Sequence, residues 1–363
     1  MDVDASKRVA IVTGANTGIG RETALGLAKA GMKVFLACRN ADKAHEAATY
    51  IRQSCSHIPG AQADVDILVL DLQSLQSVRK CATDFKSRNL PLHLLVNNAG
   101  VNLIHIPGPP WYTAEGVGGS AQINYLGPYV LTRLLEENLV AAAPSRVVNV
   151  SSIRHRQAKM HDPVYHDVPR EKFLRDFEAA SYAEAKLANI LFTFELQRRW
   201  QGKGVQACAV DPGAVASDIW KRTKYNRPPW KWLAKIVFAP TWDGALPVLH
   251  AATTPLVHDD GQLQNTTASL RLFARGAFAW PMVVAPTLSE FVLVCAVALD
   301  WQIRNLSSYC WGRRRRRRES TNRSGSSRFL SNCKEVPANP IAYDANLASK
   351  LWILSAEIAR LPA

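Results

Sequence analysis

The sequence is poor in the residue patterns that build metal centres and disulfide frameworks. Its seven cysteines, at positions 38, 55, 81, 208, 295, 310 and 333, form no CxxC pair and no cluster with histidines at zinc-finger spacing. His155, His161 and His166 lie close together but also lack a metal-binding spacing, so we expect no metal site. An odd number of scattered cysteines in a long chain is typical of reduced thiols in a reducing compartment.

An apolar leader is also missing from the start of the sequence. Residues Met1 to Arg8 are polar and run directly into an apolar segment typical of a β-strand, which is not the pattern of a secretory signal peptide. We therefore expect a cytoplasmic protein that is not secreted, with membrane association as an open alternative. Apolar residues are not scarce overall, because a content of 47% hydrophobic and 20% charged residues excludes a disordered protein.

Acidic residues are fewer than basic ones, and the imbalance is concentrated in one segment. The chain has 44 lysines and arginines against 30 acids, a formal net charge of +14, which favours a nucleic-acid or membrane-surface partner at first sight. Residues 262–327 alone contain ten arginines, no lysine and three acids, and so carry half of the net charge. The remaining 297 residues have a net charge of +7. That value is ordinary for a soluble enzyme, and we expect no nucleic-acid partner.

Strand and helix patterns alternate along the first 210 residues. Short runs rich in Val, Ile and Leu predict strands at 8–13, 33–37, 66–70, 92–96, 146–150 and 205–210, and helical spacing predicts helices between them, such as 21–30 and 78–85. Alternating strands and helices form βαβ units with a parallel sheet covered on both faces. The sequence therefore predicts an α/β fold with a Rossmann-type, doubly wound parallel sheet.

A glycine-rich loop joins the first predicted strand to the first predicted helix. It is Thr13-Gly14-Ala15-Asn16-Thr17-Gly18-Ile19-Gly20. Glycines allow the backbone to approach a pyrophosphate closely, and the N–H groups and positive dipole end of the following helix favour a phosphate. The candidate cofactor-binding residues are Gly14, Asn16, Thr17, Gly18, Ile19 and Gly20. The alternative is that the glycines serve only a tight turn.

The end of the second predicted strand lacks an acidic residue. A cofactor without a 2′-phosphate is usually held by an acid near this point, but the sequence here is Ala37-Cys38-Arg39-Asn40. Arg39 could pair with a 2′-phosphate through its planar guanidinium, which favours NADP (NADPH) over NAD. The alternative is a solvated arginine at a strand end.

Several polar residues occur where a parallel sheet places its ligand-binding groups. Tyr182 and Lys186 are four residues apart and share one face of a predicted helix. Ser151 and Ser152 directly follow the strand at 146–150, at the carboxyl edge of the sheet. The segment Asn-Asn-Ala-Gly at 97–100 follows another strand, and Asn124 lies in a predicted helix. A Tyr–Lys pair alone usually marks an ordinary helix surface, so its meaning depends on the other residues.

Together these motifs resemble the short-chain dehydrogenase/reductase (SDR) family. TGxxxGxG at 13–20, NNAG at 97–100, Asn124, Ser152, Tyr182, Lys186 and Asp-Pro-Gly at 211–213 occur in the order of that family. Ala-Cys-Arg at 37–39, Val-Asn-Val-Ser-Ser at 148–152 and Lys-Leu-Ala-Asn at 186–189 are similar to its retinol dehydrogenase-like and WW-domain-oxidoreductase-like branch, although the sequence has no WW module. The resemblance implies a single catalytic domain formed by residues 1–261 and completed by a last strand and helix at 328–363.

The resemblance also implies a role for each motif residue. Tyr182 would be the general acid in carbonyl reduction and the base in alcohol oxidation, while Lys186 would favour its phenolate and hold the nicotinamide ribose. Ser152 would align the substrate oxygen, and Asn124 would fix a helix backbone and a water of the proton relay. Further cofactor-binding residues would be Asp71, Leu72, Asn98, Ala99 and Gly100 around the adenosine, Pro212, Gly213 and Ser217 towards the carboxamide, and Tyr182 and Lys186 themselves.

The region after Ser217 is rich in aromatic residues. It contains Trp220, Tyr225, Trp230, Trp232 and Trp242. Related proteins cover the substrate with this region. We therefore predict an NADP-dependent oxidoreductase that interconverts a lipophilic carbonyl and alcohol by hydride transfer. The alternative for the aromatic residues themselves is a packed helix with solvated lysines. The alternative function is an NADP-binding regulatory or membrane-scaffold protein without turnover, which has no chemical need for the four candidate catalytic residues.

Residues 262–327 interrupt the resemblance. The stretch 277–299 is mostly apolar but contains Pro281, Pro286 and Glu290, and six arginines follow at 313–318. A single membrane span would separate 328–363 from the sheet that it should complete. A re-entrant or surface-lying membrane segment, a localisation or nucleic-acid signal, and an unstructured excursion such as a translated intron all stay open.

Two kinds of assembly are further expectations. Peripheral membrane contact would use 230–238 or 277–299, because both stretches are rich in apolar residues. A homo-oligomer would pair through the predicted helix at 115–135 and the helix that carries Tyr182, as the family resemblance implies.

Overall fold

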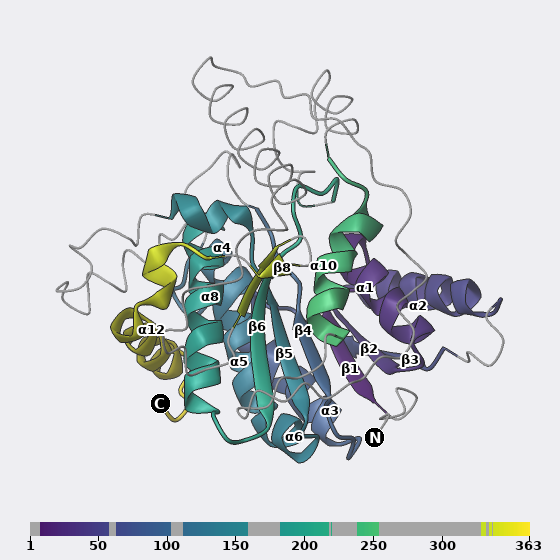
Figure 1. Ribbon diagram of the computed structural model, residues 1–363. Helices are drawn as coiled ribbons and strands as arrows, with labels where there is room; N and C mark the ends of the chain where they lie inside the picture. The colour runs from purple at the N-terminus through teal and green to yellow at the C-terminus, as the bar shows by residue number, and fades with distance from the viewer. Residues whose placement is uncertain are drawn as a thin grey trace.

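A computed structural model of the chain describes residues 8–57, 63–102, 112–158, 182–217, 219, 238–253, 328–331, 334–335 and 337–363. These residues form an eight-stranded sheet in the order β3-β2-β1-β4-β5-β6-β7-β8 (Figure 1). Its strands are β1 (Val9–Thr13), β2 (Lys33–Cys38), β3 (Val65–Val69), β4 (Leu94–Asn97), β5 (Ser145–Val150), β6 (Val205–Asp211), β7 (Arg328–Ser331) and β8 (Lys334–Glu335). Strands β1 to β7 pair in parallel, and β8 is antiparallel to β7. The predicted Rossmann-type α/β fold is confirmed.

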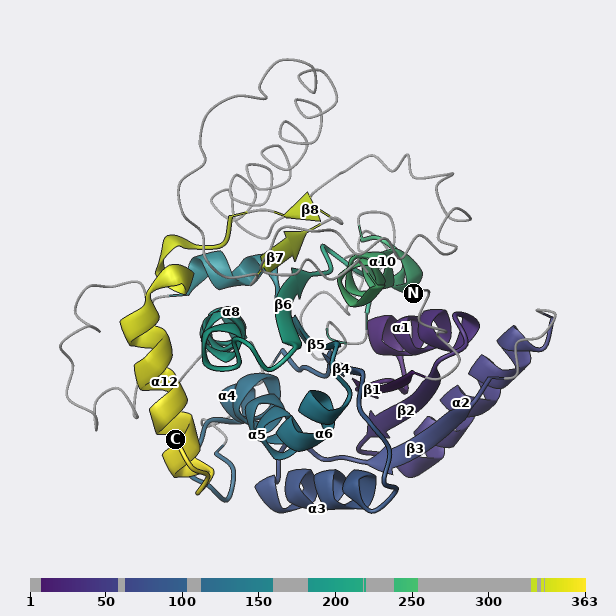
Figure 2. The ribbon, with the colours of Figure 1, turned by 60° about the horizontal axis from the view of Figure 1, so that its bottom comes forward.

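Helices cover both faces of this sheet (Figure 2). One face carries α1 (Gly18–Lys29), α2 (Ala41–Cys55) and α10 (Thr241–Thr253), and the other carries α3 (Leu75–Lys86), α4 (Gly119–Ala121), α5 (Gly127–Leu134), α6 (Glu136–Ala141) and α8 (Tyr182–Arg199). The carboxyl-terminal helix α12 (Ala345–Ile358) lies outside α8. The sheet is therefore buried between two helical layers.

Side chains of the central strands alternate between these two layers. In β1, Val9 and Ile11 belong to the core beside α3, α5 and α8, whereas Ala10 and Val12 belong to the core beside α1, α2 and α10. All five residues of β1 are buried. A strand buried on both sides needs a continuous apolar run rather than an alternating one, which is why Val- and Ile-rich runs located the strands correctly.

The predicted helix at 115–135 begins later than expected. Thr113 and Val117 close a turn in which the Val117 carbonyl accepts from the Thr113 N–H at 2.9 Å, and Gly116 has a φ of +75°. Helix α4 therefore begins at Gly119, and a π-helical turn, Gln122–Leu126, precedes α5. The glycines at 116, 118 and 119 are the signal against a longer helix, because glycine costs more conformational entropy in a helix than other residues.

The residues after 327 return to the sheet and to α8. Strand β7 pairs with β6, with Arg328 opposite Cys208, while the short antiparallel β8 was not predicted. Helix α12 buries Trp352, whose ring centroid lies 5.2 Å from that of Tyr129. Tyr129 Oη also donates to the Trp352 carbonyl at 3.2 Å. The α5 and α8 side on which we predicted subunit pairing thus contacts α12 of the same chain, and pairing there stays a prediction.

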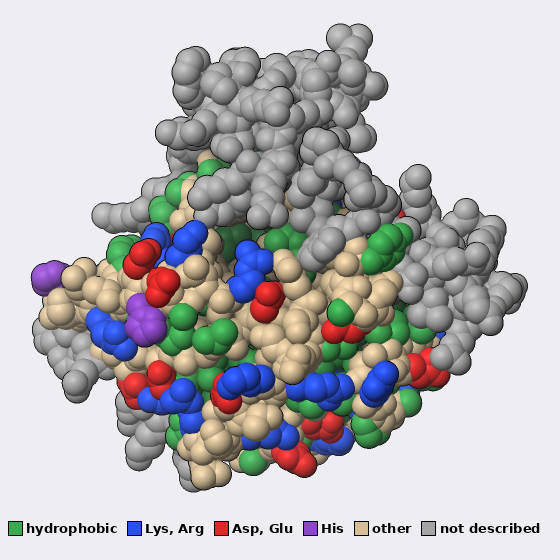
Figure 3. Space-filling view, turned by 180° about the vertical axis from the view of Figure 1, so that it is seen from behind, with side chains coloured by type: hydrophobic (Ala, Val, Ile, Leu, Met, Phe, Trp, Pro, Cys, Tyr) green, Lys and Arg blue, Asp and Glu red, His purple; other side chains and the backbone are tan. Residues whose placement is uncertain are grey.

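The remaining expectations concern membrane contact, surface charge and the cysteines. No described helix combines the length and apolar character that crossing a bilayer requires, and the stretches 277–299 and 313–318 lie outside the described residues. Basic and acidic side chains are interspersed over the described part of the face in Figure 3. Of the seven cysteines, the structure describes Cys38, Cys55, Cys81 and Cys208, and these four are free thiols.

Candidate functional site

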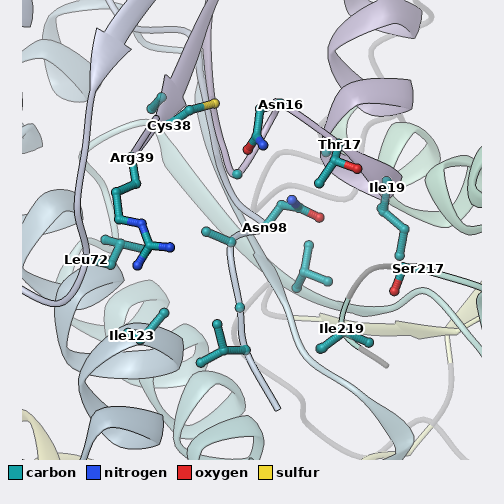
Figure 4. A pocket seen from close by; sticks show the side chains of 18 of the residues that line it. Asn16, Thr17, Ile19, Cys38, Arg39, Leu72, Asn98, Ile123, Ser217 and Ile219 are labelled. Atoms are coloured by element: carbon teal, nitrogen blue, oxygen red, sulfur yellow. The ribbon is translucent and has the colours of Figure 1, made fainter. Parts of the chain in front are cut away.

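A pocket lies at the carboxyl edge of the sheet, where the ends of β1, β2, β4, β5 and β6 meet (Figure 4). It holds about 1120 Å³ of open space, counting its opening to solvent. The predicted cofactor residues that line it are Gly14, Asn16, Thr17, Gly18, Ile19, Gly20, Arg39, Asp71, Leu72, Asn98, Ala99, Gly100, Tyr182, Lys186, Pro212 and Ser217. Gly213, Asn124 and Ser152 lie beside the lining rather than in it. The structure thus gathers residues between positions 14 and 219 around one pocket.

Two glycines of the glycine-rich segment 13–20, one before α1 and one in its first turn, are required by close contacts. Gly14 has a φ of +65°, and a Cβ there would lie 2.9 Å from Ala99 Cα. A Cβ on Gly20 would lie 2.4 Å from the Gly14 carbonyl oxygen and 2.5 Å from Asn98 Nδ2. Helix α1 begins within this segment, at Gly18, and has no acidic residue in its first turn. The backbone there forms a cradle that suits a pyrophosphate at a helix N-terminus.

Hydrogen bonds of Thr13 and Asn98 join the ends of β1 and β4 next to the cradle. Thr13 Oγ1 accepts from the N–H groups of Asn98 and Ala99 at 3.0 and 2.9 Å. Asn98 Nδ2 donates to the Thr13 carbonyl at 2.9 Å. The NNAG segment is therefore held against the glycine-rich loop by hydrogen bonds from both sides.

The side of the pocket opposite α1 is formed by the ends of β2 and β3. Arg39 extends from the end of β2 to the part of the pocket where Leu72 and Ile123 lie (Figure 4). Arg39 is exposed, and the neighbouring Asn40 side chain caps α2 by accepting from the Lys43 N–H at 2.8 Å. An exposed guanidinium beside an apolar wall is suited to an adenosine that carries a phosphate.

Asn124 sits in the π-helical turn and holds the chain that follows the NNAG segment. Its Oδ1 accepts from the Val101 N–H at 2.9 Å, and its Nδ2 donates to the Val101 and Ser120 carbonyls at 2.9 and 2.8 Å. A Cβ on Gly100 would come within 2.7 Å of Asn124 Oδ1 and 3.4 Å of Lys186 Nζ. Asn124 thus joins the π-helical turn to the backbone of Val101, next to Gly100 and Lys186. π-Helical turns are often found at functional sites.

Lys186 and Ser151 tie the first turns of α8 to the end of β5. Lys186 Nζ donates to the Val150 carbonyl at 2.8 Å, and Ser151 Oγ donates to the Lys186 carbonyl at 2.8 Å. Burial lowers the pKa of Lys186 to about 8, although the carboxylate of Asp211 acts in the opposite direction. The ammonium lies 5.4 Å from the centre of the Tyr182 ring.

Tyr182 is buried beside Ser152. Burial raises the pKa of the Tyr182 phenol well above its ordinary value, and Asp211 raises it further. A hydrogen bond with the Ser152 side chain and the charge of Arg154 lower that pKa. Tyr182 is therefore a neutral phenol near neutral pH, and it can donate a proton.

The segment after β6 closes the pocket on the α1 side. Gly213 does not line the pocket, but its N–H donates to Asp211 Oδ1 at 3.0 Å and its φ is +80°, so it makes the turn that brings Pro212 to the wall. Val215 pairs with Ala239, and Ser217 lies beside Gly18. Figure 4 shows Ser217 and Ile219 next to Ile19.

The sequence did not predict nine of the residues that line the pocket. One of the aromatic residues predicted to cover the substrate lies away from it. The missed residues are Ala37, Cys38, Leu70, Gln73, Val101, Ile123, Val150, Ser151 and Ile219. Cys38, Leu70, Val150 and Ser151 end a strand or directly follow one, so for these four the position relative to the strand end was the available signal. Trp242 is 46% exposed on α10 and does not line the pocket. Trp220, Tyr225, Trp230 and Trp232 lie outside the described residues.

Comparison with known proteins places this geometry in a family. Residues 8–166 match the family model described as "short chain dehydrogenase". The chain is 41% identical over 254 residues to retinol dehydrogenase 11 of Mus musculus, covering 70% of this chain and 75% of that protein. It is 39% identical over 252 residues to retinol dehydrogenase 12 of Homo sapiens, covering 69% and 75%.

Solved structures agree with this assignment. A Pseudomonas aeruginosa RhlG/NADP active-site complex is 25% identical, with a TM-score of 0.51 over 68% of this chain and 90% of the other. A protein from Mycobacterium paratuberculosis has a TM-score of 0.57 at 23% identity, covering 100% of both chains, and supports the fold alone. The sequence matches and the pocket together lead to one conclusion: the chain is an NAD(P)-dependent enzyme of the short-chain dehydrogenase/reductase family, similar to the retinol dehydrogenases.

Proposed function

We propose that the enzyme interconverts a lipophilic carbonyl compound and its alcohol with NADP(H), and that Tyr182 is the acid and base of the reaction. The observation that carries the proposal is the meeting of Ser152, Tyr182 and Lys186 at the end of β5, beside the glycine cradle. The hydrogen bond between Ser152 and Tyr182 leaves a hydroxyl and a phenol side by side, so one substrate oxygen can contact both.

The cradle fits a nicotinamide dinucleotide. The close contacts at Gly14 and Gly20 leave no room for a side chain, so backbone N–H groups can approach a pyrophosphate. When bound, the nicotinamide supplies or accepts the hydride. Arg39 supports NADP over NAD, because its exposed guanidinium lines the pocket at the strand end where NAD-binding sites usually place an acid. The relatives named above do not decide between the two cofactors.

Each of the four polar residues has a distinct part in the proposed reaction. Tyr182 gives its proton to the substrate oxygen in reduction and takes one in oxidation. Lys186 contributes a positive charge that favours the phenolate, and a pKa of about 8 leaves it largely protonated near neutral pH. Ser152 aligns the substrate oxygen, and Asn124 holds the backbone of residue 101 beside Lys186.

Two observations support a lipophilic substrate: the similarity to retinol dehydrogenases and the aromatic residues of the sequence. Two of the relatives are named retinol dehydrogenases, and retinol is a lipophilic alcohol. The aromatic residues predicted to cover the substrate fit the same class. The second candidate, an NADP-binding regulator or scaffold without turnover, is disfavoured because binding alone needs neither Tyr182 beside Ser152 nor a buried ammonium next to it.

Substitution of Tyr182 separates turnover from binding. We expect Tyr182→Phe to lower kcat by about 100-fold or more, since general acid–base catalysis contributes that much, while NADPH affinity by fluorescence titration changes less than threefold. The matched control is Tyr50→Phe, because Tyr50 is 39% exposed on α2. Retention of activity by Tyr182→Phe on a panel of retinoid, steroid and long-chain aldehydes would exclude the mechanism. Tighter binding of NADH than NADPH would exclude the cofactor preference.

Location and assembly complete the proposal. We expect a cytoplasmic enzyme that contacts membranes peripherally through 230–238 or 277–299, and that pairs with itself. Deletion of 262–327 tests the second contact: the deletion variant should move from the membrane to the soluble fraction of a cell lysate. Unchanged fractionation of the variant contradicts a membrane role for this stretch. Sedimentation of the full chain measures the oligomeric state.

A further inference from the structure

His155 is a buried histidine that the proposed reaction does not use. It lies in the 3₁₀ turn Ile153–Gln157, three residues after Ser152, and its side chain is fully buried. The ring Nδ1 lies 2.7 Å from the Ser152 carbonyl oxygen, which also accepts from the His155 backbone N–H at 3.0 Å. On the other side of the ring, Nε2 lies 3.1 Å from the backbone nitrogen of Asn339.

These two contacts determine which ring nitrogen carries the proton. A backbone N–H can only donate, so Nε2 of His155 must accept from Asn339 and carries no hydrogen. A carbonyl oxygen can only accept, so Nδ1 carries the hydrogen and donates it to Ser152. Burial lowers the pKa of His155 to about 4, which keeps the ring neutral near pH 7. Both hydrogen bonds therefore exist together only in the neutral Nδ1–H form.

Asn339 belongs to a segment that is itself fixed to α8. Its side chain accepts from the Ile341 N–H at 3.2 Å and caps the short turn Pro340–Tyr343. Tyr343 Oη accepts from the Ala338 N–H at 3.0 Å. The Tyr343 ring stacks on Phe194 of α8, with 5.2 Å between centroids and 25° between planes. Helix α8 begins at Tyr182, so the same helix carries the candidate acid and the support of Asn339.

We propose that His155 is a positioning residue, which holds the Ser152 backbone through a bond to the returning segment 337–343 and so places the Ser152 hydroxyl against Tyr182. The inference rests on the proposed function of Ser152 and Tyr182. The contacts form a closed path from Ser152 through His155 and Asn339 to α8 and back to Tyr182. Through this path, the segment 337–343, which follows the 262–327 stretch in sequence, holds Ser152 in place.

Ser152 needs such support because its hydroxyl has few local restraints. Its Oγ accepts from the Arg154 N–H at 3.3 Å, a long hydrogen bond, and its backbone is extended with φ −165° and ψ 153°. The carbonyl of the same residue takes two hydrogen bonds from His155. Removal of the ring leaves the carbonyl with one bond and lets the peptide rotate, and an error of about 1 Å in such a group can cost about 100-fold in rate.

Two substitutions at position 155 separate positioning from packing. His155→Ala removes both ring bonds, and we expect kcat to fall 10- to 100-fold while the Kd for NADPH changes less than threefold. His155→Asn restores a donor at the position of Nδ1, and we expect it to recover kcat to within about fivefold of wild type. The control is His93→Ala, because His93 Nδ1 also accepts a backbone N–H, that of Val9, at the opposite edge of the sheet. It should lower the melting temperature but not kcat.

Substitution of Asn339 tests the hydrogen bond between its backbone N–H and His155 Nε2 while the histidine stays unchanged. Asn339 has a φ of −54°, which proline also adopts, so Asn339→Pro removes the N–H donor with the backbone in place. Asn339→Ala keeps that N–H and removes the side-chain cap. We expect Asn339→Pro to lower kcat at least fivefold more than Asn339→Ala. Equal kcat for the two, or equal kcat for His155→Ala and His93→Ala, would overturn the proposal.

A spectroscopic readout separates this inference from the proposed function. In ¹⁵N NMR spectra of the histidine-labelled full chain at pH 7, His155 should be a neutral Nδ1–H ring, identified by the signal that His155→Asn removes. An Nε2–H ring would refute the geometry whatever the enzyme turns over. If Tyr182→Phe stays active while the Nδ1–H signal is present, the proposed function fails and the contacts of His155 stand. If Tyr182→Phe is inactive but His155→Ala is not, only the positioning role fails.

Discussion

Replacement of Gly14 by alanine tests the cofactor cradle through two separate costs. The first is conformational, since a φ of +65° costs a residue with a Cβ roughly 1–2 kcal/mol. The second is steric, because the added Cβ would lie 2.9 Å from Ala99 Cα and 3.1 Å from Ala99 Cβ. Both atoms belong to the NNAG segment, which hydrogen bonds hold against β1. Forcing extra volume into such a packed contact costs about 1–3 kcal/mol.

A control glycine isolates the steric cost. Gly202 has a φ of +79°, but a Cβ there would meet no atom within 4 Å in the described part of the chain. Gly202→Ala should therefore lose about 1–2 kcal/mol from backbone strain alone, and Gly14→Ala about 2–5 kcal/mol. Urea unfolding monitored by tryptophan fluorescence, without cofactor, measures both losses. The difference between them reports the contact with Ala99.

Cofactor binding gives the second half of this test. Relief of the clash moves Ala99, which lines the pocket, so Gly14→Ala should weaken NADPH binding at least tenfold. Gly202→Ala should leave the Kd unchanged because the loop before β6 lies at the other edge of the sheet. Equal unfolding free energies and equal Kd values for the two variants would refute the description of this loop as a cradle that cannot accept a side chain.

Three further predictions follow from other contacts. Arg39→Ser should lower the preference for NADPH over NADH at least tenfold in Kd by fluorescence titration, because it removes the guanidinium from the pocket; an unchanged ratio would contradict that role. His155 has a folded pKa of about 4 against an ordinary 6.5, so the unfolded state takes the proton first as pH falls. Stability due to the neutral ring is complete above pH 6.5, and about 2 kcal/mol of it should be lost by pH 5 in urea unfolding. His155→Gln should lack that loss, and an identical pH slope in this variant would refute the assignment. Trp352→Ala should cost about 3–5 kcal/mol, because Trp352 is 3% exposed and joins α12 to Tyr129 and Phe192; a loss below 1 kcal/mol would show that α12 is not docked.

Many residues that line the pocket could be named from the sequence because they lie at the strand ends. Strands β1, β2 and β5 were predicted to within one or two residues, since buried parallel strands are continuous apolar runs bounded by polar ones. Residues that line the pocket, such as Gly14 and Arg39, directly follow such runs. Once the strand ends are known, topology brings these residues together without any knowledge of side-chain contacts.

Other features depend on contacts between residues far apart in sequence, and no local pattern reports those. His155 lies in a polar sequence, yet it is fully buried and accepts a hydrogen bond from the N–H of Asn339, 184 positions away. The side chain of Asn124 bonds to the backbone of Val101, 23 positions away, as well as to Ser120 on its own helical segment. Family likeness marked Asn124 as a site residue, but the same likeness gave His155 no role. Only the fold connects that histidine to Asn339, and through the segment of Asn339 to α8.

The placement of the chain ends around residues 254–327 explains how the SDR fold can contain them. Helix α10 ends at Thr253, and the carbonyl of Ala251 in its last turn lies 3.8 Å from Cys208 Sγ. Strand β7 begins at Arg328, opposite the same Cys208 in the sheet. The chain therefore leaves and re-enters the described structure at one place on β6, away from the carboxyl edge that forms the pocket. Because closing a longer loop costs only about 0.6 kcal/mol for each doubling of its length, a long basic stretch can be joined there without displacing Tyr182 or the cradle at Gly14.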